Sequence, residues 1–298
     1  MMVKNGHDEI RDVRYRAPSP EVGGIEVLSL AELHRRMGSR PGLDTAQRID
    51  FHQLLTVHRG ALRHMVDFTD HTLDPGSWLW VRPGQIQQFR QSSGVTGTLV
   101  LFQPGVLDTP TAAQTRLEDP FGRTHWQLSD EDADATGRAL EHLVHAFGST
   151  GLLPAPVRSR VLEHLLAVLL LQLTHPITPL GSPAAEGTET FLRFRTAVEE
   201  RFTRTRHVGD YARALGYSPR TLTRATTAAA GMSAKEFIDA RVVLEAKRLL
   251  AHGEDPVARI AARFGFDDAS NFVKYFALRA GTTPAAFRHR YQIGSNQQ

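Results

Sequence analysis

Two arginines near the C-terminal end of the chain have the type and the spacing to hydrogen-bond nucleobases. Arg220 and Arg224 lie four residues apart in the segment SPRTLTR, which begins at Ser218. On a helix, residues at that spacing project from the same face, and each guanidinium can donate two hydrogen bonds to O6 and N7 of a guanine. The hydroxyls of Thr221 and Thr223 can bond phosphates or bases. For Arg224, the plainer alternative is a solvated surface charge.

A second polar group follows about fifty residues later. It consists of Ser270, Asn271 and Lys274, and Asp267 and Asp268 precede it. The two carboxylates would repel phosphate unless they serve as helix caps. We therefore expect this group to position the chain on DNA more than to read its sequence.

An internal repeat supplies the elements that must carry both groups. VGDYARALGY at 208–217 aligns with VARIAARFGF at 257–266, and the glycines Gly231 and Gly281 close the two copies. In each copy a short amphipathic helix ends near a glycine, an aromatic residue follows, and a cap-forming residue starts the next helix. This pattern predicts two helix-turn-helix units, at 208–231 and 257–281.

A predicted helix at 234–251 joins the two units. Ser233 and Glu236 form a capping box at its start. Its length is about 27 Å at 1.5 Å per residue, close to the spacing of about 34 Å between consecutive major grooves on one face of a duplex. We expect this helix to place the two units in adjacent grooves.

Charge divides the chain in the same place. Residues 191–298 hold 18 Lys and Arg against 10 Asp and Glu, whereas residues 1–190 hold 17 against 22. The balances are +8 and −5, so a polyanionic partner is expected for the C-terminal part only. Residues 175–188, rich in Pro, Gly and Ser, are predicted to link a domain at 1–174 to one at 189–298.

Residues 191–291 resemble the DNA-binding domain of the AraC/XylS family. The resemblance is carried by YARALGYSPRTLTR, RVVLEAKRLLAHG, IAARFGFDDASNFVKYF and GTTPAAFR. It implies that Arg220 and Arg224 are base-reading positions. From their places on the two predicted recognition helices, we also expect the following residues to contact DNA: Ser218, Thr221, Thr223, Ser270, Asn271 and Lys274. The chain departs from the family at Thr226 and Thr227, where an aromatic residue followed by a basic one is usual.

The N-terminal half is predicted to be a β-barrel. Segments at 51–57, 61–68, 77–81 and 96–102 are rich in β-branched and aromatic residues, with turn residues between them. Two predicted helices follow, at 130–147 and 157–174. Residues 51–89 resemble the cupin-like sensor barrel that often precedes this DNA-binding domain, and the two helices resemble the pair that dimerises such regulators. His64, Trp80 and Gln87 are the candidate residues lining a ligand cavity, and a filled barrel that serves only for dimerisation is the alternative.

Many cupins are metal enzymes, so a metal site in the barrel is an alternative. Their ligands include a His-x-His pair, and this chain has 14 histidines but none at that spacing. His52, His58 and His64 are interpreted as structural. The chain has no cysteine, which excludes disulfides and thiolate ligands. We expect no catalytic residue, no metal and no cofactor.

These features together predict a multidomain, cytoplasmic transcription regulator, with a cupin-like barrel before an all-α DNA-binding domain. We expect it to be an activator that binds double-stranded DNA, a small-molecule effector and RNA polymerase, and that forms a homodimer without membrane association. A regulator without a ligand and a cupin metalloenzyme fused to a DNA-binding domain are the alternatives.

Overall fold

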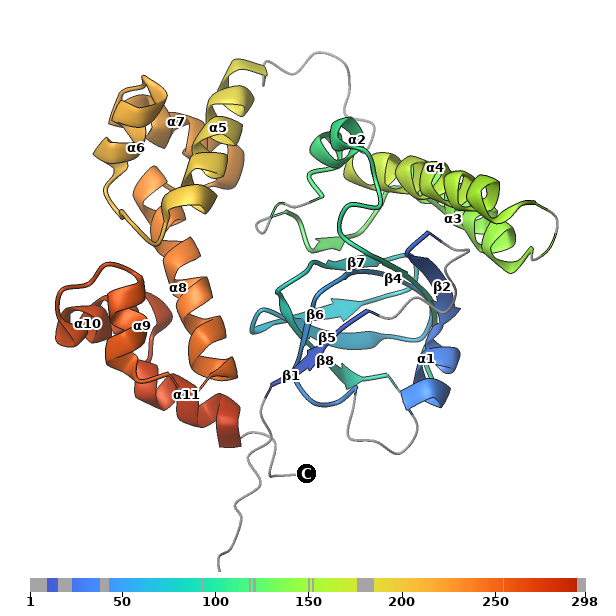
Figure 1. Cartoon of the computed structure of the whole chain (residues 1–298), viewed down its shortest axis with the longest axis horizontal. Coiled ribbons are helices and arrows are strands. Elements are labelled where there is room, and N and C mark those ends of the chain that lie inside the picture. The colour runs from blue at the N-terminus through green and yellow to red at the C-terminus, as the bar shows by residue number, and fades with distance from the viewer. Residues whose placement is uncertain are drawn as a thin grey trace, which may run out of the picture. The chain divides into compact units, whose positions relative to one another are not determined.

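The computed structural model describes residues 10–15, 23–37, 43–92, 94–117, 119, 122–149, 151, 153–175, 185–253 and 255–293. They form two compact units, one within Ile10–Thr178 and one within Pro179–Gln298 (Figure 1). The residues predicted as a linker lie mostly outside the described ranges, and the second unit opens with a helix at Ala185. Among the described helices, none has the length and apolar character needed to cross a membrane.

Two five-stranded sheets build the N-terminal unit. Sheet A has the order β1-β3-β8-β5-β6, and sheet B has the order β10-β7-β4-β9-β2. The strands are β1 Arg11–Val13, β2 Ile25–Ser29, β3 Gln47–Ile49, β4 His52–Arg59, β5 Leu62–Val66, β6 Thr69–Leu73, β7 Trp78–Val81, β8 Ile86–Gln91, β9 Thr96–Phe102 and β10 His125–Trp126. Two short helices, α1 Leu30–Met37 and α2 Thr109–Gln114, lie in the connections. This architecture confirms the predicted cupin-like barrel.

One hairpin differs from the prediction. The sequence predicts a strand at 61–68 and a turn at 70–76, whereas the chain turns at Asp67 and Phe68 and continues as strand β6. Both turn residues have positive φ, 47° and 67°, as in the two-residue turns that match strand twist. The Asp67 carboxylate accepts hydrogen bonds from the Gln85 side chain at 2.7 Å and the Ile86 amide at 3.2 Å. These bonds hold the turn in place without glycine.

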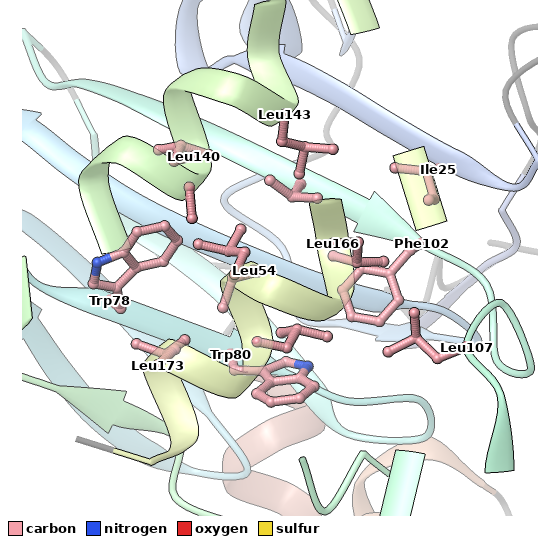
Figure 2. Close-up of a cluster of buried hydrophobic side chains, with 14 of the residues drawn as sticks. Ile25, Leu54, Trp78, Trp80, Phe102, Leu107, Leu140, Leu143, Leu166 and Leu173 are labelled. Atoms are coloured by element: carbon pink, nitrogen blue, oxygen red, sulfur yellow. The ribbon is translucent and has the colours of Figure 1, made fainter. Parts of the chain in front are cut away.

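Side chains of sheet B are buried on both of its faces. One face meets sheet A in the barrel interior, where the core includes Leu55, Leu79 and Val81. The other face packs against α3 Asp130–Gly148 and α4 Ala155–Thr174. Figure 2 shows this second core, in which Leu140 and Leu143 of α3 and Leu166 and Leu173 of α4 lie over the sheet.

Seven helices make up the described part of the C-terminal unit. They are α5 Ala185–Arg201, α6 Val208–Leu215, α7 Pro219–Ala230, α8 Ala234–His252, α9 Val257–Arg263, α10 Ala269–Ala280 and α11 Pro284–Ile293. Helices α6 and α7 form the first predicted unit, and α9 and α10 form the second. Helix α8 joins them over 19 residues (Figure 1). The all-α domain with two helix-turn-helix units is thus confirmed.

Candidate nucleic-acid interface and effector site

Local hydrogen bonds fix the turn of the first helix-turn-helix unit. Gly216 ends α6 in the left-handed conformation, with φ of 73°, which glycine adopts without the clash of a Cβ atom. Ser218 then caps α7, because its hydroxyl accepts a hydrogen bond from the Thr221 amide at 3.1 Å. The predicted contact residue Ser218 is therefore the N-cap of the recognition helix.

Arg220 and Arg224 are exposed on α7, as the spacing predicts. Neither has an ion pair or hydrogen bond to another described residue, so both guanidiniums are available to an external partner. Leu222 is fully buried and anchors the opposite face of the helix. Thr221 and Thr223 are half-buried at the edge of the exposed face.

The two threonines that depart from the family pattern have local roles. Thr226 is fully buried, and its hydroxyl donates to the Leu222 carbonyl at 2.7 Å within α7. That bond satisfies a polar group that would otherwise be costly to bury. Thr227 is exposed, and its hydroxyl donates to the Met232 carbonyl at 3.3 Å. It therefore stabilises the end of α7 and supplies no positive charge.

The second unit repeats the arrangement with a different cap. Asp268 caps α10 by accepting a hydrogen bond from the Ser270 amide at 3.0 Å. The Asp268 carboxylate therefore serves as a helix cap. Asp267 is exposed. Ser270, Asn271 and Lys274 are all exposed on α10.

An apolar side chain extends the exposed face of α10. Leu278 lies four residues after Lys274 and is 81% exposed, so the two share one face of the helix. The opposite face is anchored by the buried Phe272 and Phe276. Leu278 is not among the residues predicted to contact DNA, although its spacing from Ser270 and Lys274 is visible in the sequence.

Partly buried ion pairs attach α8 to α5 and to α10. Arg241 of α8 contacts Glu199 of α5 at 2.9 Å. Asp239 of α8 accepts a hydrogen bond from the Tyr275 hydroxyl at 2.6 Å and forms an ion pair with Arg279 at 2.7 Å, both on α10. Side chains of α8 therefore contact one helix that precedes α8 in the chain and one that follows it. Arg279 is a structural residue.

In the barrel, His64 and Gln87 form one polar cluster with Gln53. The Gln53 amide donates to Gln87 Oε1 at 2.7 Å, and His64 Nε2 donates to the same oxygen at 3.0 Å. All three residues are buried. Burial lowers the pKa of His64 to about 3, so its ring is neutral at physiological pH.

Beside this cluster, two buried atoms have no hydrogen-bond partner among the described residues. They are His64 Nδ1, an acceptor when Nε2 carries the proton, and the Nε2 donor of Gln47. Gln47 pairs directly opposite Gln87 across strands β3 and β8, so the two side chains share a face. The sequence reasoning missed Gln47 and Gln53, because polar strand residues at unknown facing carry no distinct signal.

Trp80 does not join this cluster. It pairs opposite Leu54 and belongs to the core beneath the helices (Figure 2), whereas the adjacent pair Gln53 and Val81 faces the barrel interior. Its indole donates to His52 Nδ1 at 3.2 Å. His64 and Gln87 of sheet A therefore face the barrel interior, whereas Trp80 lies on the helix-covered face of sheet B, because successive side chains of a strand alternate.

The histidines show no metal centre within the described ranges, where no group of three or more His, Asp or Glu side chains could hold an ion. His71 and His125 pair edge to face with ring centroids 5.8 Å apart. Of the histidines interpreted as structural, His52 keeps a buried Nε2 without a partner, and burial lowers its pKa to about 3.

Comparison with known proteins matches both units. The helix-turn-helix domain model matches residues 211–290, and the AraC-like ligand-binding domain model matches residues 32–174. The transcriptional activator RhaS of Salmonella schwarzengrund is 23% identical over 243 residues, covering 80% of this chain and 85% of that protein. RhaS of Pectobacterium carotovorum is 24% identical over 245 residues, with coverages of 81% and 86%. ToxT from Vibrio cholerae, solved with an unsaturated fatty acid, aligns over 92% of this chain and 97% of its own at 13% identity, with a TM-score of 0.41.

A tandem helix-turn-helix unit preceded by a ligand-binding barrel defines a DNA-binding transcription regulator. Both family models match, and they match in the order that such regulators have. The chain belongs to the AraC/XylS family of transcription regulators.

Proposed function

We propose that this protein activates transcription by reading a DNA site with two recognition helices, α7 and α10, under control of a small effector. The observation that carries the proposal is that Arg220 and Arg224 are exposed on α7 without an ion pair or hydrogen bond to another described residue, and that Lys274 is exposed on α10. Side chains exposed in this way can donate to base edges in a major groove. The curated relatives with matching length are named as activators, which supports the sign of the regulation.

Selection from a random pool of duplexes tests the DNA-binding part directly. The full-length protein should enrich one sequence with two half-sites about one helical turn apart. Footprinting on that duplex should show protection of both half-sites. Binding to all sequences with equal affinity would contradict the proposal.

For the effector, we propose a site in the barrel interior at His64, Gln87, Gln53 and Gln47. The unpartnered acceptor on His64 and donor on Gln47 support it, because buried polar groups without partners are rare. All four side chains are uncharged at neutral pH, and a charged ligand would lose its hydration without a countercharge. The proposal is therefore an uncharged ligand with hydroxyl or amide groups.

Thermal-shift screening separates this proposal from a filled barrel. Uncharged polyols and sugars should raise the melting temperature, and their carboxylate analogues should not. Gln47→Leu should abolish the shift, whereas Thr72→Ala, an exposed change on β6, should keep it. If no compound raises the melting temperature of the wild type while leaving that of Gln47→Leu unchanged, the barrel without a ligand is favoured.

We further propose that the protein works in the cytoplasm as a homodimer that contacts RNA polymerase, and that it acts by binding and not by catalysis. Exposed apolar side chains on the outer helices support the dimer: Val144 of α3 and Val157 and Val168 of α4.

The alternative, a cupin metalloenzyme fused to a DNA-binding domain, requires a bound transition metal. Metal analysis of the purified protein tests it, and one metal ion per chain would favour the enzyme.

A further inference from the structure

One side chain just before the first helix-turn-helix unit contacts the turn of the second. Arg206 lies in the connection between α5 and α6, just before the first unit. Its guanidinium donates hydrogen bonds to the Phe264 carbonyl and, at 3.3 Å, to the Gly265 carbonyl. It also lies over the Phe266 ring, 3.7 Å from the ring centroid. Three contacts of one guanidinium thus converge on the turn between α9 and α10.

The backbone of the same connection approaches this turn closely. A Cβ atom at Gly265 would lie 3.6 Å from the Thr203 carbonyl oxygen and 3.8 Å from that of Arg204. Gly265 also has a positive φ of 67°, so a side chain is disfavoured there. The rings of Phe202 and Phe264 lie 6.3 Å apart beside it. The connection at 202–206 therefore packs directly on the second helix-turn-helix unit, while the Phe202 ring also contacts Arg241 of α8, whose guanidinium carbon lies 3.9 Å from the ring centroid.

This contact is suited to fix an orientation. A helix such as α8 sets the separation of two units, but helices bend and the units can twist about them. A second attachment point removes that freedom. Arginine is matched to the task, because its planar fork reaches two carbonyls at once and stacks on an aromatic ring, which a lysine cannot do. Its positive charge is also favourable at the C-terminal end of α9.

We propose that Arg206 is a positioning residue that locks α7 and α10 at one relative orientation, so that both recognition helices dock on a duplex at one half-site spacing. The proposal rests on the proposed function, because it assumes that both helices bind DNA. It assigns to Arg206 no contact with DNA.

The test uses the full-length protein and the duplex that the wild type enriches from a random pool. One half-site loses its protection in Arg224→Ala, and that half-site is assigned to the first helix-turn-helix unit. A second duplex has the other half-site scrambled, and a third has two base pairs inserted between the half-sites. The variants are Arg206→Ala and Arg206→Lys. Arg204→Ala is the matched control, because Arg204 carries the same charge two residues away with its side chain exposed.

We expect Arg206→Ala to weaken binding to the enriched duplex by about tenfold, since an unfixed second unit loses effective concentration at its half-site. That tenfold loss corresponds to about 1.4 kcal/mol. Binding of the variant to the duplex with the scrambled half-site should stay within about twofold of wild type. The insertion should cost the variant less than it costs the wild type. Arg206→Lys should share the defect, and Arg204→Ala should not.

Three results would overturn the proposal. They are unchanged affinity for the enriched duplex, an equal loss on the enriched and scrambled duplexes, and rescue by Arg206→Lys. An equal loss would indicate a phosphate contact or a folding defect, and rescue by lysine would indicate a role for charge alone. If the wild type enriches no duplex, the proposed function fails first.

Discussion

At the scale of single residues, arginines of the C-terminal unit have opposite roles. The guanidiniums of Arg220 and Arg224 are exposed and unpaired, whereas that of Arg241 is buried between carboxylates. Water solvates the first two until a partner replaces it, and Glu199 and Glu245 replace water for the third. Exposure and pairing, and not residue type, separate the candidate DNA contacts from structural arginines.

Arg224→Ala should weaken binding to the enriched duplex by about 1–3 kcal/mol, because a bidentate contact to one base would be lost. Preference at one base position should relax. Competition binding with single-base variants of the duplex measures both effects. Arg213→Ala is the control, since Arg213 is exposed on α6 and pairs with Asp210. Equal weakening on enriched and random duplexes would assign Arg224 to the phosphate backbone.

The barrel interior predicts a pH dependence of stability. Burial lowers the pKa of His64 to about 3 from the ordinary value of 6.5, and the same holds for His52. Below pH 6.5 the unfolded chain takes up protons at these rings while the folded chain does not. The free energy of unfolding should therefore fall as the pH drops from 6.5 toward 3, by up to about 1.4 kcal/mol per pH unit for each ring.

Tryptophan fluorescence in denaturant measures this effect in one unit. All three tryptophans, at 78, 80 and 126, lie in the N-terminal unit. His64→Gln keeps a donor for Gln87 and removes one titrating ring, so its slope against pH should be smaller than that of wild type, by up to about 1.4 kcal/mol per pH unit. His142→Gln, an exposed change on α3, should keep the full slope. An unchanged slope in His64→Gln would show that the ring is protonated in the folded state.

At the scale of elements, α4 has two apolar faces with different partners. Leu162, Leu166 and Leu173 are fully buried against sheet B and α3. On another face, Val157 and Val168 are 48% and 45% exposed, and Val161 lies between them at helical spacing. A helix that is apolar all round is expected where it is covered from more than one side. A second copy of the chain is the cover we propose.

Val168→Asp should shift the protein from dimer to monomer, because the carboxylate would be buried without a partner in the interface. Sedimentation equilibrium measures the change, and tryptophan fluorescence confirms that the barrel remains folded. Thr72→Asp adds the same charge at an exposed position on β6 and should leave the dimer intact. A dimeric Val168→Asp protein would place the interface elsewhere.

At the scale of the whole molecule, charge separates the two functions. The balance is +8 for residues 191–298 and −5 for residues 1–190. We therefore expect the C-terminal unit to attract DNA of any sequence. The negatively charged N-terminal unit, which is joined to it, should repel the same DNA. Such opposition reduces binding to random DNA while the specific contacts remain.

A fragment of residues 179–298 should accordingly bind random duplexes more tightly than the full chain at low salt. The difference should disappear at high salt, because screening removes the long-range repulsion. Fluorescence anisotropy across a salt series measures it. The fragment should still prefer the enriched duplex. A folded fragment without any sequence preference would contradict the assignment of both helix-turn-helix units.

The sequence by itself determined the DNA-binding unit. Its helices, turns and caps rest on contacts within a few residues, such as Ser218 to Thr221, the box of Ser233 and Glu236, and the left-handed Gly216. Local bonds of this kind have local sequence signatures. The repeat at 208–231 and 257–281 could be recognised for that reason.

Only the tertiary structure decided which strand residues meet. Every residue of β7 is buried, because the barrel covers one face of sheet B and two helices cover the other. The usual alternation of polar and apolar residues is absent from such a strand, so nothing in its sequence tells that Trp80 faces the helices. The same holds for Arg206, whose partners Phe264 and Gly265 lie more than fifty residues away. Contacts across such separations depend on how folded elements pack, and a local pattern carries no record of that.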